Sequence, residues 1–126
     1  MVDTKNVINK QEKLIVLEKA HELTVKIYKL TASFPKTEQF RLVDQLCRSM
    51  SSVPANIAEG NSRQMKKEFI QFLYQAKGSL AETEYHLRLA KDLKYITEID
   101  YNNLIEQCDE VGRLISGLIN YLRSTI

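Results

Sequence analysis

Two long amphipathic segments flank the stretch Ser52-Val53-Pro54-Ala55-Asn56-Ile57-Ala58-Glu59-Gly60-Asn61-Ser62-Arg63. Pro54 lacks a backbone donor and crowds the carbonyl four residues earlier, so the helix is expected to kink or restart there. Gly60 is expected to end that helix as a left-handed cap. Asn56, Glu59 and Arg63 are spaced by three and four residues, which places them on one helix face. The stretch therefore marks a helix end and the turn into the next helix.

Apolar residues recur at alternating spacings of three and four along four segments, which is typical of amphipathic helices. These stripes run from Val16 to Phe34, from Phe40 to Ile57, from Phe69 to Ala90 and from Tyr101 to Leu122. No segment shows the alternation expected of a strand. Short connections between four helices predict an all-α protein, an antiparallel up-down-up-down four-helix bundle with its second helix kinked at Pro54.

Local signals predict how individual helices begin and pack. Thr37 is expected to cap the second helix, and Thr97 the fourth. Phe40 is assigned to the apolar face of the second helix. The third helix is expected to cover about residues 66–94 and to contain Gly78, whose small neighbours suggest a close approach between helices.

Composition and length fit a single globular domain. Hydrophobic residues make up 44% of the 126 residues and charged residues 27%, which argues against disorder. Residues 1–11 are polar and are expected to be flexible, with residues 12–126 forming the bundle. No apolar run approaches the roughly 20 residues needed to cross a bilayer, and the N-terminus lacks a signal-peptide core. We therefore expect a cytoplasmic protein with no membrane partner.

A search for chemistry yields no reaction and no cofactor. A di-metal bundle needs two Glu-x-x-His motifs, and Glu18 with His21 supplies only one. The other histidine, His86, lies one turn after Glu82, which is explained by a polar pair on one helix. Cys47 and Cys108 fall on apolar stripes and are interpreted as buried thiols. We expect neither a metal site nor an enzyme.

The basic residues are unevenly distributed. Residues 1–96 hold 16 Lys and Arg against 11 Asp and Glu, whereas residues 97–126 hold 2 against 5. Clustered cations neutralise phosphates and favour RNA or DNA binding; solvated helix faces, or pairing with the acidic last helix, explain the same pattern. For Arg48, a pair with Glu59 or Glu82 is the main competing interpretation. The candidate nucleic-acid-binding residues are Arg41, Arg48, Arg63, Lys66, Lys67, Lys91 and Lys94.

Several motifs together resemble one family, the four-helix bundle proteins encoded within intervening sequences of bacterial 23S ribosomal RNA genes. The motifs are Phe34-Pro35, Gln45-Leu46-x-Arg48, Ser52-x-Pro54-Ala55-Asn56-Ile57-Ala58-Glu59-Gly60, Arg63, Glu68-Phe69, Phe72-Leu73, Ala76-x-Gly78-Ser79-Leu80-x-Glu82 and Tyr95. The match spans about residues 14–122. One departure is Met65, where relatives often carry a serine that caps the third helix, so Ser62 is expected to act as the cap instead.

The resemblance implies a four-helix bundle that assembles into a ring-like homopentamer. Relatives include the accessory variability determinants of diversity-generating retroelements, which resemble basic barrels that bind a reverse transcriptase and nucleic acid. By the same resemblance, Arg48, Asn56, Glu59 and Glu82 belong to a shared polar core or subunit contact. The full set of structural or oligomer-motif residues is Pro54, Asn56, Glu59, Gly60, Gly78, Ser79 and Glu82.

Two hypotheses about function follow. The first is an oligomer that binds structured RNA through its basic residues. The second is a protein-interaction scaffold, for a reverse transcriptase or an RNA-processing partner, whose charges only organise the ring. A broad apolar face on the last helix, widened by Ile105, Gly112 and Ile119, favours self-association under either hypothesis.

Overall fold

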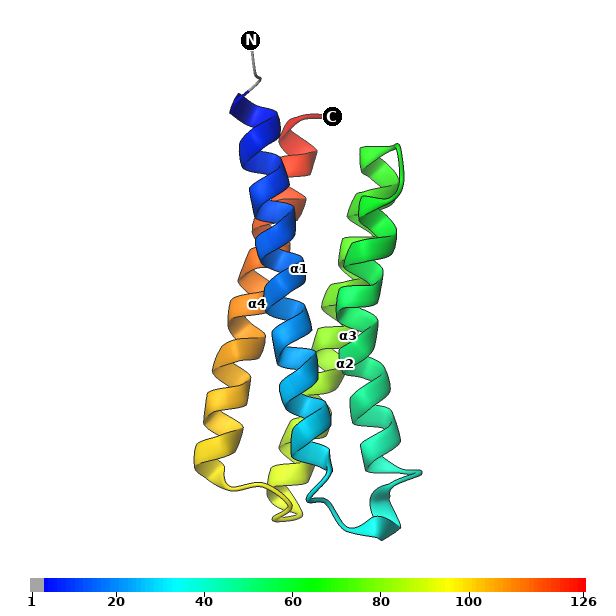
Figure 1. Ribbon diagram of the computed structural model, residues 1–126, viewed down its shortest axis with the longest axis vertical. Coiled ribbons are helices and arrows are strands. Elements are labelled where there is room, and N and C mark those ends of the chain that lie inside the picture. Colours follow the sequence, from blue (N-terminus) through cyan, green and yellow to red (C-terminus); the bar gives the residue numbers. More distant parts are fainter. Residues whose placement is uncertain (1–3) are drawn as a thin grey trace.

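Four antiparallel helices and one short turn make up the computed structural model, which describes the backbone of residues 4–126 and the side chains of residue 13 and residues 15–126. The elements are α1 (Thr4–Thr31), the 3-10 turn η1 (Lys36–Glu38), α2 (Leu42–Asn61), α3 (Lys66–Asp92) and α4 (Glu98–Ser124). In Figure 1, α1 and α3 run in one direction and α2 and α4 in the other, with α1 beside α4 and α2 beside α3. The predicted all-α four-helix bundle is confirmed, and the described part of the chain contains no strand.

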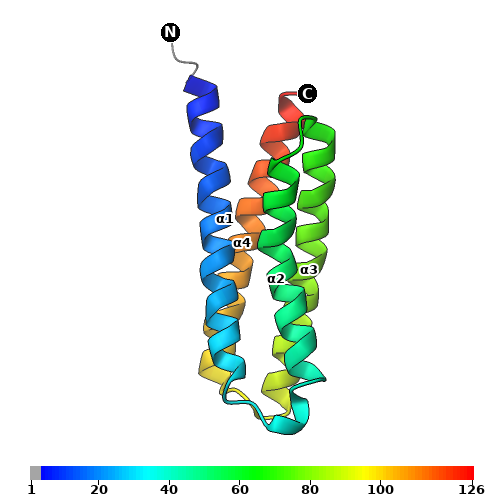
Figure 2. The same ribbon diagram turned by 45° about the vertical axis from the view of Figure 1, so that its right-hand side comes forward.

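The N-terminal end of the bundle starts earlier than the apolar stripe alone indicated. Helix α1 begins at Thr4, and residues 1–3 lie outside the described residues. The flexibility expected of residues 1–11, and hence the division at residue 12, stays a prediction. Figure 2 shows α1 reaching past the other helices at the end where both termini lie.

The core is formed by the predicted stripes. Its largest fully buried side chains include Leu23, Ile27, Leu46, Leu73 and Ile115. Burying each such side chain stabilises the fold by about 1.5–3 kcal/mol relative to leaving it in water. Helix α2 packs most extensively against α3, and α4 closes the bundle against α1 and α3.

The start of α2 differs from the prediction. Helix α2 begins at Leu42, whereas Thr37 lies in η1 and caps nothing. The reason is Glu38, whose buried carboxylate accepts a hydrogen bond from the Tyr95 hydroxyl at 2.9 Å. Holding Glu38 inward tightens the turn and leaves Phe40 in the link before α2, where it is 87% exposed. The assignment of Phe40 to the apolar face is therefore wrong.

The stretch of residues 52–63 also differs from the prediction in two respects. Helix α2 continues through Pro54 without restarting, while a bend at that residue stays a prediction. Gly60 is not a left-handed cap, because no described glycine has a positive φ. A Cβ on Gly60 would lie 2.7 Å from the Cβ of Phe72 and 2.8 Å from Cδ1 of Phe69. This glycine is required by the close approach of α3 to the end of α2.

The left-handed residue lies instead at the end of α3. Lys94 has a φ of 65°. Its N–H donates to the Lys91 carbonyl at 2.9 Å, and the Tyr95 N–H donates to the Ala90 carbonyl at 2.9 Å. These two bonds form a complete Schellman motif, which satisfies the last carbonyls of the helix.

Three further local predictions are resolved. Thr97 caps α4 as expected, its hydroxyl accepting from the Asp100 N–H at 3.1 Å. Ser62 does not cap α3: its hydroxyl donates to the Glu59 carbonyl at 2.6 Å, and Met65 occupies the cap position without a side-chain bond. Gly78 does not serve close helix packing within the chain, because a Cβ there meets no atom within 4 Å.

Candidate interaction surfaces

The predicted basic residues lie at opposite ends of the bundle. Lys66 and Lys67 begin α3, whereas Lys91 lies in its last turn and Lys94 follows it. At 1.5 Å per residue, α3 separates Lys66 from Lys91 by about 37 Å. The structure therefore brings the cations together in two groups and not on one continuous surface.

The first group lies beside the chain termini. The Lys66 ammonium donates to the Thr125 carbonyl at 3.0 Å, which ties the start of α3 to the end of α4. Arg63 pairs with Glu59 at 2.6 Å and with Glu68 at 3.8 Å. Lys67 is exposed and makes no ion pair with the described residues.

Two cations missed by the sequence analysis join this group. The Lys13 ammonium lies 5.3 Å from the Phe69 ring centroid, and the Arg123 guanidinium lies 5.2 Å from that of Tyr74. Both rings belong to the first part of α3, which is also where Lys66 and Lys67 lie. We call the five cations the basic end: Lys13, Arg63, Lys66, Lys67 and Arg123.

The second group lies at the opposite end and is more nearly neutralised. Arg41 is 3.5 Å from the Glu38 carboxylate. Lys91 lies 3.9 Å from Asp92 and 4.4 Å from the Tyr101 ring centroid. Lys94 is exposed and has no ion pair with the described residues. Carboxylates at this end therefore offset most of its positive charge.

The hydrogen bond that anchors η1 also affects a tyrosine at this end. The pKa of Tyr95 is raised, chiefly because its hydroxyl donates to the Glu38 carboxylate. The Phe34 and Tyr95 rings also contact each other, with centroids 5.4 Å apart. These contacts fix the α3–α4 loop against η1.

Arg48 lies apart from both groups, on the outer face of α2. Its Nε donates to Asp44 at 3.2 Å, one turn earlier on the same helix. The competing interpretation, a pair of Arg48 with Glu59 or Glu82, is not the one that forms, because Arg48 pairs with Asp44 and Glu59 binds Arg63. The Arg48 side chain is 81% exposed, so most of its guanidinium faces solvent.

Asn56 and Ser79, two of the motif residues, take part in a polar seam between α2 and α3. The Asn56 amide donates to the Ser52 carbonyl at 2.8 Å and to its hydroxyl at 2.9 Å. The Ser79 hydroxyl donates to that of Ser52 at 2.9 Å, and the Thr83 hydroxyl to that of Ser49 at 2.9 Å. These bonds pair Ser49 with Thr83 and Ser52 with Ser79, which fixes the height of α2 relative to α3.

Glu82 and His86 do not form the expected polar pair. Both ring nitrogens of His86 are buried without a hydrogen-bond partner, although the two residues lie one turn apart. Glu82 is exposed on α3. Its assignment to a shared polar core or subunit contact stays a prediction.

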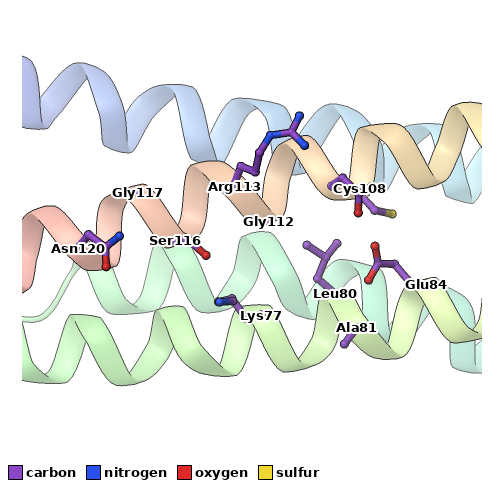
Figure 3. A pocket seen from close by; sticks show the side chains of 11 residues that line it. Lys77, Leu80, Ala81, Glu84, Cys108, Gly112, Arg113, Ser116, Gly117 and Asn120 are labelled. Atoms are coloured by element: carbon purple, nitrogen blue, oxygen red, sulfur yellow. The ribbon is translucent and has the colours of Figure 1, made fainter.

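A groove of about 630 Å³ lies between α3 and α4, and no pattern in the sequence predicted it. Figure 3 shows Glu84 extending from α3 toward α4 near Cys108. Burial raises the pKa of Glu84, and the neighbouring Asp109 carboxyl raises it further. Burial also raises the pKa of the Cys108 thiol to about 12. The groove is lined by Lys77, Leu80, Ala81, Glu84, Cys108, Asp109, Gly112, Arg113, Ser116, Gly117 and Asn120.

The described residues offer neither a metal site nor a membrane-spanning helix. Within them, no three His, Cys, Asp or Glu side chains come close enough to hold a metal ion. None of the described helices is both long and apolar enough to cross a membrane. Cys47 and Cys108 are free thiols, and the Cys47 sulfur lies 3.7 Å from the Thr31 hydroxyl.

The architecture and its surfaces define a small helical bundle with one basic end and a polar seam. Within that class, the chain belongs to the 23S rRNA-intervening sequence protein family, whose model matches residues 12–117. This finding confirms the resemblance inferred from the motifs.

One solved structure supports the same family. It is the crystal structure of a protein with unknown function from the S23 ribosomal protein family of Bacteroides thetaiotaomicron. The two chains are 29% identical, with a TM-score of 0.80, and the match covers 86% of this chain and 98% of that one. Among curated proteins, none matches this chain.

Proposed function

We propose that this protein is a non-enzymatic homo-oligomer that binds structured RNA through its basic end. The observation that carries the proposal is the local charge balance. Leaving Lys13 aside, the basic end holds four cations, Arg63, Lys66, Lys67 and Arg123, and two carboxylates, Glu59 and Glu68, pair there with one of them, Arg63. An excess of cations attracts phosphates without regard to sequence.

Assembly would strengthen this binding. The resemblance implies a pentamer, and a ring of parallel copies repeats the basic end once per subunit on the same side. Several weak phosphate contacts on one rigid support bind together more tightly than each does alone. A structured RNA presents many closely spaced phosphates and is suited to such a surface.

Self-association is supported by a glycine in the α3–α4 groove. A Cβ on Gly117 would meet no atom within 4 Å, so the chain itself makes no use of the missing side chain. A glycine inside a helix costs about 1 kcal/mol relative to alanine. Close approach by a second chain gives this glycine a role. Light scattering is expected to give a mass of several chains at low and moderate salt.

Salt-dependent binding to a structured RNA fragment tests the assigned surface. The test variant replaces Lys66 and Lys67 with alanine. The control replaces Lys91 and Lys94, at the other end of α3, so both variants lose two lysines. For two lost phosphate contacts, the slope of log affinity against log salt should fall by about 1.4–1.8 in the test variant. Little change is expected in the control.

Each outcome bears on the proposal. Weaker binding and a shallower slope only on replacing Lys66 and Lys67 support the basic end. Loss confined to the Lys91 and Lys94 variant, or to neither, contradicts it. So does wild-type affinity that stays constant between about 50 and 200 mM salt, because phosphate contacts release counterions.

A second candidate is a protein-interaction scaffold without direct nucleic-acid contact. One observation favours it: Arg41, Arg48, Arg63 and Lys91 each have a carboxylate within 4 Å. Paired cations of this kind organise helix ends and contribute little to phosphate binding. Capture of a reverse transcriptase or RNA-processing protein that survives nuclease treatment and moderate salt would support the scaffold. Loss of capture after nuclease treatment would support the RNA-binding candidate.

A further inference from the structure

Glu84 and Asp109 both line the α3–α4 groove. We call these two residues the Glu84–Asp109 pair. No ion pair joins either of them to a described Lys or Arg. Lys77 and Arg113 line the same groove, but Figure 3 shows Arg113 turned toward α1. Two neighbouring carboxyls repel each other when both are ionised, and a guanidinium bound between them relieves that repulsion.

Arg48 lies at the matching height on another face of the same bundle. Thr83 is hydrogen-bonded to Ser49, so Glu84, the next residue of α3, is level with Arg48, the preceding residue of α2. The Ser79–Ser52 bond confirms this antiparallel register one turn away. An arginine and its complementary carboxyl pair thus occupy the same level on different faces.

The surroundings of Arg48 allow another helix to approach. Asp44 binds Nε, which leaves Nη1 and Nη2 directed to solvent in the described structure. Beyond Arg48, the outer face of α2 carries small residues, which are half-buried Ser51 and exposed Ala55 and Ala58. By the same register, Ala55 is level with Lys77, in the part of α3 that lines the groove.

The α3–α4 groove is also lined by small residues, like the outer face of α2. A Cβ on Gly117 would meet nothing within 4 Å, and one on Gly112 would meet only Leu80, at 3.5 Å. Figure 3 shows both glycines on α4 along the groove, with Ala81 on α3 opposite. A helix that carries small residues on its outer face is therefore able to pack closely against the groove, while one long side chain reaches the carboxyl pair.

We propose that Arg48 of one copy enters the α3–α4 groove of the next copy and pairs there with Glu84 and Asp109. The two faces differ, so the contact is head-to-tail, and their equal height allows copies to follow one another around an axis parallel to the bundle. Such contacts close into a ring. This inference rests on the proposed homo-oligomer and identifies the faces that meet in it.

Charge reversal and exchange provide the test, with mass measured by sedimentation over a range of protein concentrations. Arg48→Glu and Glu84→Arg, each alone, should weaken association by about 10- to 100-fold, the effect of losing a charged hydrogen-bonded pair. The double variant, with the charges exchanged, should recover most of the wild-type association. Lys29→Glu, an equal charge change on exposed α1, is the control and should retain the wild-type mass. Far-UV circular dichroism checks that each variant is helical.

The outcomes separate this contact from the oligomer itself. Loss in both single variants with recovery in the double variant supports the contact. A wild-type assembly that both single variants preserve, or a loss that the exchange does not restore, overturns the contact and leaves the oligomer standing. A wild-type protein that is a single chain at all concentrations overturns both.

Discussion

Replacing Gly60 with alanine tests the close approach of α2 to α3. The new Cβ would lie 2.7 Å from the Phe72 Cβ and 2.8 Å from Cδ1 of Phe69. The Phe72 Cβ is fixed to its backbone and Phe69 is buried, so neither atom can move away without separating the helices. Overpacking of this kind costs about 1–3 kcal/mol. The better helix propensity of alanine returns about 1 kcal/mol. The free energy of unfolding should therefore fall by up to about 2 kcal/mol.

Gly78 supplies the matched control because it is also a helix-interior glycine, but with nothing within 4 Å of an added Cβ. Gly78→Ala should therefore raise the free energy of unfolding by up to about 1 kcal/mol. Urea unfolding followed by far-UV circular dichroism, at one protein concentration, measures both changes. A Gly60→Ala variant stabilised as much as Gly78→Ala would refute the reasoning, because the added Cβ at residue 60 would then cost nothing beyond the shared gain in helix propensity.

Three further predictions concern single side chains. Met65 has the extended backbone of an N-cap, with φ −95° and ψ 130°, so Met65→Ser should accept a hydrogen bond from the Glu68 N–H and add about 1 kcal/mol to the free energy of unfolding in urea. Lys94→Gly removes a Cβ from the left-handed position at φ 65° and should stabilise by about 1 kcal/mol, seen as a higher melting temperature. Burial raises the pKa of Cys108 to about 12, so at about pH 8 iodoacetamide should label half-buried Cys47 first and Cys108 only after unfolding, as read by peptide mass spectrometry.

The sequence predicted the helices because their signal is local and repeated. A stripe such as Leu23 and Ile27 on α1 recurs every turn, and burying it requires only some neighbouring apolar face. Thr97 was predictable for the same reason, since its bond to Asp100 stays within one turn. Elements whose determinants lie within a few residues were therefore recovered.

The errors share a different cause, which is interaction between distant residues. Thr37 looked like a cap, but Glu38 was drawn inward by Tyr95, far along the chain. Gly60 looked like a terminal glycine, although its role depends on two aromatic side chains of the next helix. A local pattern gives only the propensity of a residue to cap or end a helix, and contacts with distant residues decide whether it does so.

The candidate surfaces were only partly predictable. Lys66 and Lys67 are adjacent in sequence, so the sequence alone predicts that they lie together. Lys13 and Arg123 join them only because the fold brings α1 and the end of α4 to the first part of α3. The Glu84–Asp109 pair depends on how α3 faces α4. The sequence contains each residue but not the register that places them together.

The pH dependence of assembly tests that pair by a separate route. Burial and the neighbouring Asp109 carboxyl raise the pKa of Glu84 above the ordinary value of 4.5. The other ionisable groups lining the groove are Asp109, Lys77, Arg113 and the Cys108 thiol, whose pKa is about 12, so Glu84 is the residue in the groove whose raised pKa this experiment tests.

If Arg48 of a second copy pairs with the Glu84 carboxylate, it favours the ionised form, so near the raised pKa the assembled state binds fewer protons than separate chains. Association should then strengthen as pH rises through the raised pKa of Glu84 and level off above it. Within one chain the sign is opposite: the folded state holds the proton more tightly than the unfolded state, so this contribution to folding is present at low pH and is lost as pH rises through the raised pKa. Sedimentation from about pH 5 to about pH 8 at fixed ionic strength measures the first effect. Glu84→Gln keeps a hydrogen-bonding partner for Asp109 but has no carboxyl proton to release, so its association should change less with pH. An equal slope in this variant, or wild-type association that weakens as pH rises, would show that no arginine takes the place of the proton.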